Sequence, residues 1–422
     1  MNHLITKKFM YKDRLLVEDK NIGISLFCIY AFISSLANDT VLPSSIGSLT
    51  LYLFLGYSVM YIMWKKMLHI ELMTKWMMVF MAFSVFSLIY SPENALFSNS
   101  EFYQLIVSFI LILFLTQYNI NIKDISRISW AYVLSAGTLI IILLSQGKLT
   151  GFSTSNRFGQ ELFGNSNILA SLLMKASMYA VWLLIYSDNK IIKKAILVLC
   201  LAASYYGMFL SGGRKFIVIP FVFLYVLLML KQDDRGKRHM IKYTAIFIFM
   251  VAVVYYLIMN VPAFYAVIGE RMESLFSFFL TGSSISGHSA EQRADMINFG
   301  LRKWLESPIW GYGFDSFKYY NRSMTGHFYY SHNNFVELLY NLGIIGFVIY
   351  YWFYLYLFKT AWKGKFYYTP KVRAFVIGLV LSMLVFEYGA VNYSSTQSLI
   401  MFYFAYTLLK ETECEMEEII NE

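Results

Sequence analysis

Charged residues are scarce in this chain: Asp, Glu, Lys and Arg make up 14% of its 422 residues, whereas about a quarter is usual in soluble proteins. Hydrophobic residues make up 58%. A soluble globular fold is therefore excluded, and the lipid bilayer is the solvent that this composition suits. Phe (37) and Tyr (34) are abundant. Because Tyr and Trp favour the water interface, many of these rings are expected to belt the membrane boundaries.

Cysteine is also rare, and the three residues present, Cys28, Cys200 and Cys414, are far apart in the sequence. This excludes a disulfide framework and a cysteine metal cluster, and gives no support to redox chemistry. The chain has no convincing internal repeat and no low-complexity tract. That argues against a transporter, because many transporters are built from inverted halves.

Apolar stretches close to the length that crosses a bilayer recur about twelve times along the chain. They are residues 22–38, 42–64, 72–90, 101–118, 128–145, 166–187, 195–211, 216–230, 243–262, 333–358, 374–391 and 396–409. The sequence therefore predicts an all-α polytopic membrane protein with about 12 transmembrane helices. Its three parts are residues 1–262 with nine spans, a large polar extracytoplasmic loop over 263–332, and residues 333–422 with three spans and a tail. The first apolar run is interpreted as a retained helix, since no small-residue cleavage site follows it.

Basic residues fix the orientation of this arrangement. Most of them fall on one side, and by the positive-inside rule that side is cytoplasmic. They are Lys7, Lys8, Lys12, Arg14, Lys65, Lys66, Lys123, Arg127, Lys190, Lys193, Lys194, Arg235, Lys237, Arg238, Lys363, Lys365 and Arg373. The protein is then expected in the inner (cytoplasmic) membrane, with both termini in the cytoplasm. The net charge of +9 belongs to this face, so no nucleic-acid partner is expected.

Three arginines break the pattern, because they lie on the predicted outer side close to helix starts. Arg157 precedes the sixth span, Arg214 opens the eighth in SGGRKF, and Arg293 lies in the large loop. A helix start carries free N–H groups and the positive end of the helix dipole, so it can receive an anion. A basic residue placed there opposes the dipole, and a bound anion would resolve that conflict.

Each of these signals has a structural explanation as well. Asn165 and Ser166 near Arg157 are ordinary helix-capping residues. Arg214 could snorkel toward water from a tight turn. Arg293 could pair with Glu291 or Asp295.

His332 sits where the tenth span enters the membrane, where a histidine often serves only as a cap or a hydrogen-bonded structural group. Several arginines with one histidine at a single membrane face nevertheless suit a diphosphate. Arginine grips phosphate oxygens through paired N–H groups, and histidine can hold or release a proton near neutral pH. No cage of carboxylates accompanies them, so neither a Mg²⁺ site nor a cofactor is indicated.

At these residues the sequence resembles the O-antigen ligase and polymerase superfamily, the Wzy and WaaL type membrane glycosyltransferases. The strongest part of the resemblance runs from Arg293 to Gly346, as Arg293, Trp304, Pro308, Gly311, Gly313, His332, Asn333, Glu337, Gly343 and Gly346. Arg157 with GNSNILA and the turn SGGRK match weaker family features. Departures are an additional Gly213 beside Arg214, and Ser166 where the family often has proline.

The resemblance implies a fold like that of C-type glycosyltransferases and a metal-independent, inverting transfer of glycan from a polyprenyl diphosphate carrier to an acceptor sugar hydroxyl. It implies that Arg157, Arg214 and Arg293 bind the diphosphate, and that His332 is the general base or a further diphosphate ligand. Glu337 either orients His332 or caps its helix. Tyr and Trp residues of the loop either stack on sugar rings or pack its core. Expected partners are the polyprenyl-diphosphate-linked oligosaccharide, membrane lipids and a chain-length regulator protein.

Lys175 lies about ten residues into the sixth span, where an unpaired charge is costly. It is expected to face the interior of the bundle and to meet either a lipid-linked phosphate or Glu387, or else to snorkel.

The leading hypothesis is a polymerase of polysaccharide repeat units (O-antigen, capsule or exopolysaccharide). A ligase that transfers finished glycan to a lipid core or protein is the first alternative. Richness in Lys, Asn, Ile and Tyr suggests an AT-rich genome, where capsule and exopolysaccharide loci are plentiful, and this favours the polymerase. A flippase for the same lipid-linked sugar would need charged residues along a pathway across several spans, and a scaffold would not need arginines at successive helix starts.

Overall fold

A computed structural model describes residues 19–37, 41–92, 100–147, 157–187, 190–230, 237–281, 289–326, 328–364 and 368–421. Helices dominate these residues, and no strand occurs among them. The predicted all-α class is therefore confirmed.

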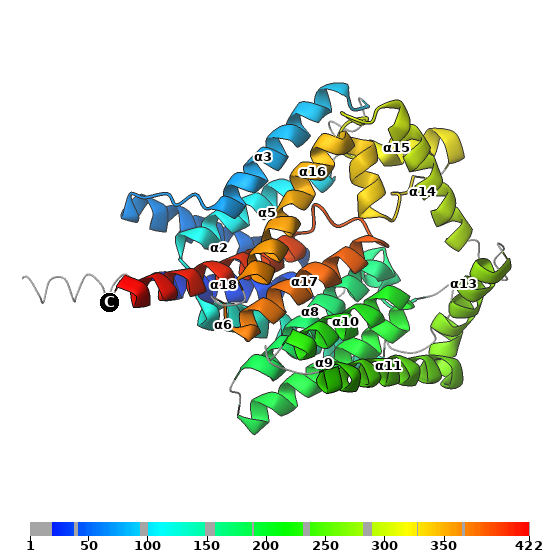
Figure 1. The fold of residues 1–422 in the computed structure, drawn as a ribbon, viewed down its shortest axis with the longest axis horizontal. Coiled ribbons are helices and arrows are strands. Elements are labelled where there is room, and N and C mark those ends of the chain that lie inside the picture. The colour runs from blue at the N-terminus through cyan, green and yellow to red at the C-terminus, as the bar shows by residue number, and fades with distance from the viewer. Residues whose placement is uncertain are drawn as a thin grey trace, which may run out of the picture.

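The first half of the chain forms long helices joined by short connections (Figure 1). They are a helix over residues 19–34, α2 (Ser44–Lys65), α3 (Leu72–Ser87) with η1 (Leu88–Tyr90), α5 (Ser100–Gln117), α6 (Ile122–Ser145), α7 (Gln160–Phe163), α8 (Ser166–Tyr186), α9 (Ile191–Ser211) and α10 (Arg214–Leu230). The second half adds α11 (Lys237–Asn260), α12 (Pro262–Phe264), the π-helical turn η2 (Tyr265–Gly269), α13 (Glu270–Thr281), α14 (Ser289–Glu306), α15 (Phe317–Thr325), α16 (Asn334–Lys363), α17 (Pro370–Glu387) and α18 (Thr396–Asn421).

Each of the twelve predicted apolar stretches coincides with one of these helices. In the described part of the chain, 7 helices are long and apolar enough to cross a membrane. They are Ser44–Lys65, Leu72–Tyr90, Ile122–Ser145, Ser166–Tyr186, Ile191–Ser211, Met240–Asn260 and Asn334–Lys363. The number of twelve spans stays a prediction.

Several helices begin before their predicted apolar stretches, and in α6 the cap that lies upstream of the apolar run explains the difference. Asn121 accepts hydrogen bonds from the backbone N–H groups of Lys123 and Asp124, and the Asp124 carboxylate accepts one from the N–H of Asn121. This reciprocal capping box starts α6 at Ile122 rather than near residue 128.

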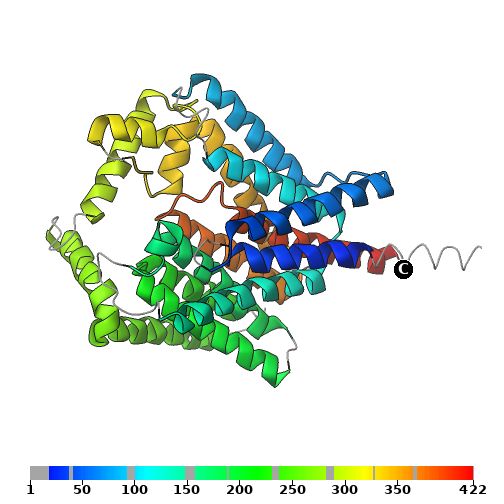
Figure 2. The same cartoon turned by 180° about the vertical axis from the view of Figure 1, so that it is seen from behind.

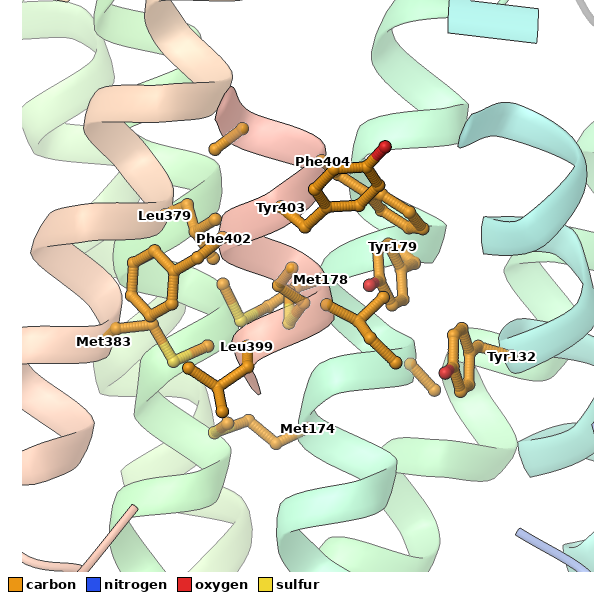
Figure 3. Close-up of a cluster of buried hydrophobic side chains, with 14 of the residues drawn as sticks. Tyr132, Met174, Met178, Tyr179, Leu379, Met383, Leu399, Phe402, Tyr403 and Phe404 are labelled. Atoms are coloured by element: carbon orange, nitrogen blue, oxygen red, sulfur yellow. The ribbon is translucent and has the colours of Figure 1, made fainter. Parts of the chain in front are cut away.

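α8 lies at the centre of the bundle. Its span is 78% buried, against 6% for the span in α11, and it packs on α6, α9 and α10. Figure 3 shows Tyr132 of α6 and Tyr179 of α8 beside the apolar side chains of α17 and α18; the two rings are stacked, with their centroids 5.5 Å apart. The centre of the protein is therefore a layer of packed, mostly apolar side chains.

α16 is broken near its start. Gly343 has φ 62° and ψ −167°, a conformation open in practice only to glycine. The break lets residues 308–313 run against it: Tyr312 N donates to Tyr340 O (2.9 Å), Gly313 N to Asn341 O (2.8 Å), and Ile344 N to Pro308 O (2.9 Å). The predicted span 333–358 is therefore a short helix followed, after the break, by a long one.

The segment predicted as a loop, residues 263–332, contains the short helices α13, α14 and α15 among its described residues. Figures 1 and 2 place these helices at the end of the molecule opposite the C-terminus. The same end carries the starts of α8, α10 and α16, so residues far apart in the sequence meet there.

Candidate active site

A cavity of about 490 Å³ opens at this end of the bundle. Its lining includes residues from α5, α8 and α10, from the segment before α16, and from the connection between α17 and α18. The polar and charged members are Ser34, Glu101, Gln104, Asn165, Asn167, Ser171, Lys175, Lys215, Tyr330, His332, Asn392, Ser394, Ser395, Thr396 and Gln397.

The connection between α17 and α18 is fixed to the start of α16 by an amide. The Asn334 side-chain oxygen accepts hydrogen bonds from Asn392 N (2.8 Å) and Tyr393 N (3.1 Å), and its NH₂ group donates to the Tyr351 hydroxyl (3.0 Å). This wall of the cavity is therefore held at a set distance from His332.

Arg214 follows the turn that ends α9. Gly212 adopts the left-handed conformation there (φ 71°), and a side chain at this position would press on Arg157 and Val267. The Arg214 guanidinium donates a hydrogen bond to the main-chain oxygen of Arg271. The short Ser-Gly-Gly-Arg turn thus brings the backbone close to two other arginine-bearing segments.

Arg271 was not singled out from the sequence, yet it completes this group. It lies just after the π-helical turn η2 and donates to the main-chain oxygen of Gly212 (3.0 Å). Burial, with repulsion from Arg157, Arg214 and Arg293, lowers the pKa of Arg271 to about 9. The available signal was that Arg271, like the other three, is a basic residue on the predicted outer side.

Burial also lowers the pKa of Arg157 and of Arg293, and repulsion from Arg157 adds to the effect at Arg293. These mutual effects mean that the four guanidinium groups are close enough to repel one another. The structure therefore brings together all three predicted arginines and adds a fourth.

None of the four arginines forms an ion pair with a described carboxylate. In particular, the predicted alternative in which Arg293 pairs with Glu291 or Asp295 does not occur among these residues. Four partly buried positive charges without a counter-charge are unfavourable unless an anion joins them. The arrangement suits a ligand that carries several negative charges.

His332 lines the cavity directly before the Asn333 cap of α16. Its backbone is left-handed (φ 56°), which is uncommon for a residue with a side chain. Burial, with repulsion from Arg293 and Lys215, lowers the pKa of His332 to about 3. The imidazole is therefore neutral at physiological pH and able to accept a proton.

Glu337 is fully buried and hydrogen-bonds to the chain beside His332. Its carboxylate accepts from Ser331 N (2.8 Å) and from the Asn341 side chain (3.4 Å). The cap of the helix is instead Asn333, whose side chain accepts from the N–H groups of Phe335 and Val336. Glu337 thus holds the backbone that carries His332.

Glu101 lines the cavity and was also not singled out from the sequence. Its carboxylate accepts hydrogen bonds from the Tyr330 hydroxyl (3.0 Å) and the Ser394 hydroxyl. The aromatic residues of the loop fall into two groups: Phe314 and Phe317 are buried, whereas Trp310 and Tyr329 are about half exposed. Tyr330 is the tyrosine of this loop that lines the cavity.

Lys175 faces the interior, as predicted. It is 4% exposed, and its ammonium group donates to the Ser395 hydroxyl (2.9 Å). Lys215, at the start of α10, donates to the main-chain oxygen of Gly389. Both lysines line the same cavity as His332.

An all-helical chain with apolar helices of bilayer length and a cationic cavity at one end defines a helical membrane protein with a site for an anionic ligand. Residues 195–351 match the family model Wzy_C, described as O-antigen ligase. This match supports the O-antigen ligase/polymerase superfamily that the motifs indicated, a family of glycosyltransferase-like membrane enzymes. The matched segment contains Arg214, Arg271, Arg293, His332 and Glu337. No curated protein matches the chain.

Proposed function

We propose that this protein is a polysaccharide repeat-unit polymerase, which transfers glycan from a polyprenyl diphosphate carrier to a sugar hydroxyl of a second carrier-linked glycan. The observation that carries the proposal is the convergence of four arginines, none of them paired with a carboxylate among the described residues, beside a neutral histidine. The family match is the second support.

In this proposal Arg157, Arg214, Arg271 and Arg293 hold the diphosphate. The acceptor oxygen attacks the anomeric carbon of the donor sugar as the bond from that carbon to the phosphate oxygen breaks. The bonding electrons leave with the diphosphate, whose negative charge grows, and the guanidinium groups stabilise that charge. Attack opposite the leaving group inverts the anomeric centre. The positive charge that a metal ion would otherwise supply comes from the arginines, so the reaction proceeds without a metal.

His332 accepts the proton of the acceptor hydroxyl during this step. A low pKa in the empty site keeps it neutral, and a bound diphosphate raises that pKa by offsetting the positive charge of Arg293 and Lys215. The base therefore becomes stronger when substrate is present. If His332 is a diphosphate ligand instead, it contributes to substrate binding alone. Measuring the affinity of His332→Gln for the substrate separates the two roles.

The orientation proposed for the chain puts both termini in the cytoplasm and the cavity on the outer face of the cytoplasmic membrane. The distribution of basic residues along the sequence supports it. The carrier would then present its glycan outside the cell membrane, with its lipid tail in the bilayer. A chain-length regulator protein is the partner expected there.

The length of the glycan made by a deletion strain tests this proposal. A polymerase leaves single repeat units on the acceptor when it is missing, and wild-type protein restores the ladder of long chains. Long chains that accumulate on the carrier without reaching an acceptor would identify a ligase instead. Lipid-linked repeat units that stay on the cytoplasmic side of the membrane would identify a flippase.

A further inference from the structure

A second positive group lies deep in the cavity, away from the arginines. Lys175 is the tenth residue of α8, so with a rise of about 1.5 Å per residue it lies roughly 14 Å along the helix from Ser166. The cavity reaches from Asn165 at the outer end of α8 to Lys175. The floor of the cavity near Lys175 is therefore separate from its outer end near Asn165.

No carboxylate among the described residues forms an ion pair with Lys175. The nearest acidic group in electrostatic range is Glu387, but its carboxylate accepts hydrogen bonds from Tyr350 (3.1 Å), Tyr351 (2.9 Å), Tyr354 and Asn392 (3.2 Å). Lys175 itself donates to the neutral Ser395 hydroxyl. An uncompensated charge inside a membrane protein is costly, and such residues generally serve a ligand or pathway.

The groups around this lysine suit a sugar. Gln104, Ser395, Thr396 and Gln397 line the same cavity with amide and hydroxyl groups, which hydrogen-bond to sugar hydroxyls. The single carboxylate of the lining, Glu101, is already bonded to Tyr330 and Ser394. The ammonium groups of Lys175 and Lys215 lie 5.9 Å and 5.3 Å from the centroid of the Phe386 ring, and Lys215 donates to the main-chain oxygen of Gly389. This part of the cavity therefore offers two ammonium groups, of which Lys175 lies among neutral hydrogen-bonding groups.

We infer that Lys175 binds the carboxylate of an acidic sugar, such as a hexuronic acid, in the glycan that enters the cavity; this rests on the proposed function. An ammonium group pairs with a carboxylate as a point charge, whereas the four arginines, with their paired N–H groups, match the diphosphate. A phospholipid headgroup fits less well, because its acyl chains would meet the polar lining.

The sugar composition of the polymer tests the inference without any variant. The polysaccharide that is lost from a deletion strain and restored by wild-type protein is hydrolysed and analysed for uronic and other carboxylated sugars. An acidic sugar in every repeat unit supports the inference. A neutral repeat unit overturns it while the polymerase function stands. Survival of the polymer after deletion contradicts the proposed function itself.

Binding to the purified full-length protein provides a second test. Thermal unfolding is followed with methyl glucuronide, methyl glucoside or inorganic phosphate, using wild type, Lys175→Met and the exposed-residue control Lys193→Met. We expect glucuronide to raise the Tm of wild type and Lys193→Met by several degrees, with no rise for Lys175→Met or with glucoside. Stabilisation by phosphate instead of glucuronide, lost in Lys175→Met, would assign the site to a phosphate and overturn the inference, as would equal effects of glucuronide and glucoside.

Discussion

At the scale of single residues, the arginine group forms from four positions that are far apart in the sequence. Arg271 is flanked by Glu270 and Glu273 in the sequence, which suggests local pairing. In the structure its guanidinium instead donates a hydrogen bond to the main-chain oxygen of Gly212 and lies close enough to the other three arginines for their charges to lower its pKa. A contact between residues 59 positions apart could not be predicted from sequence spacing, because nothing in the loop specifies how it returns to the bundle.

Replacement of Arg271 by alanine is expected to lower transfer activity by about 100-fold or more, the usual effect of removing one group that stabilises transition-state charge. Arg271→Lys keeps the charge but not the paired N–H groups, so intermediate activity is expected. Initial rates of lipid-linked glycan consumption measure this, with exposed Arg302→Ala as the control that keeps normal activity. Full activity of Arg271→Ala at normal protein levels would remove this residue from the site.

His332 makes stability depend on pH in a defined direction. Its pKa is lowered from 6.5 to about 3 in the folded chain. Between these values the unfolded chain binds the proton and the folded chain does not, so stability falls as pH drops below 6.5. The loss is at most about 1.4 kcal/mol per pH unit.

Thermal unfolding of wild type and His332→Gln at pH 7 and pH 5 measures the contribution of His332 to the pH dependence of stability, as the difference between the two proteins. We expect the Tm of wild type to fall more on acidification than the Tm of the variant. Other titrating groups cancel in the comparison: the pKa of Asp315, which burial raises to about 7, is common to both proteins. Parallel pH dependence of the two proteins would mean that His332 titrates normally.

At the scale of elements, the helices follow from hydrophobic runs of bilayer length, so their positions could be predicted closely from the sequence. The hydrophobic runs did not reveal the break in α16, because residues 333–358 form a single stretch long enough to cross the membrane. Only the approach of residues 308–313 makes the break necessary, and that is a tertiary contact. Gly311 and Gly343 are the residues in the sequence that reflect this contact, because a Cβ on either would lie within 2.6 Å of the other segment's backbone.

Gly343→Ala is therefore expected to destabilise the protein by about 2 kcal/mol or more, from strain at positive φ and from contact with the Ile309 carbonyl. Gly56→Ala in α2 is the matched control, because no atom lies within 4 Å of its added Cβ. The yield of folded protein and its Tm in detergent measure the effect. Equal Tm values for the two variants would show that the break does not depend on glycine.

At the scale of the whole molecule, the orientation in the membrane determines where the chemistry occurs. The site residues gather at one end of the bundle, and the predicted topology makes that end extracytoplasmic. Leu305, which is 69% exposed in α14, should then be accessible from outside the cell membrane. Lys123, exposed at the start of α6, should not.

Labelling of Leu305→Cys and Lys123→Cys with a membrane-impermeant maleimide tests the orientation. In spheroplasts we expect only Leu305→Cys to react above the background of the unmodified chain, whereas lysis should expose Lys123→Cys as well. Labelling of Lys123→Cys before lysis, without Leu305→Cys, would reverse the orientation and put the cavity on the cytoplasmic side.

The central claim is that the arginines and His332 transfer glycan between diphosphate-linked carriers. The purified protein, reconstituted in liposomes with carrier-linked repeat units and a metal chelator, tests it most directly. We predict a ladder of longer carrier-linked chains together with free polyprenyl diphosphate, and no ladder with His332→Ala or Arg293→Ala. Repeat units that remain single with wild-type protein, or a ladder that persists in both variants, would contradict the account.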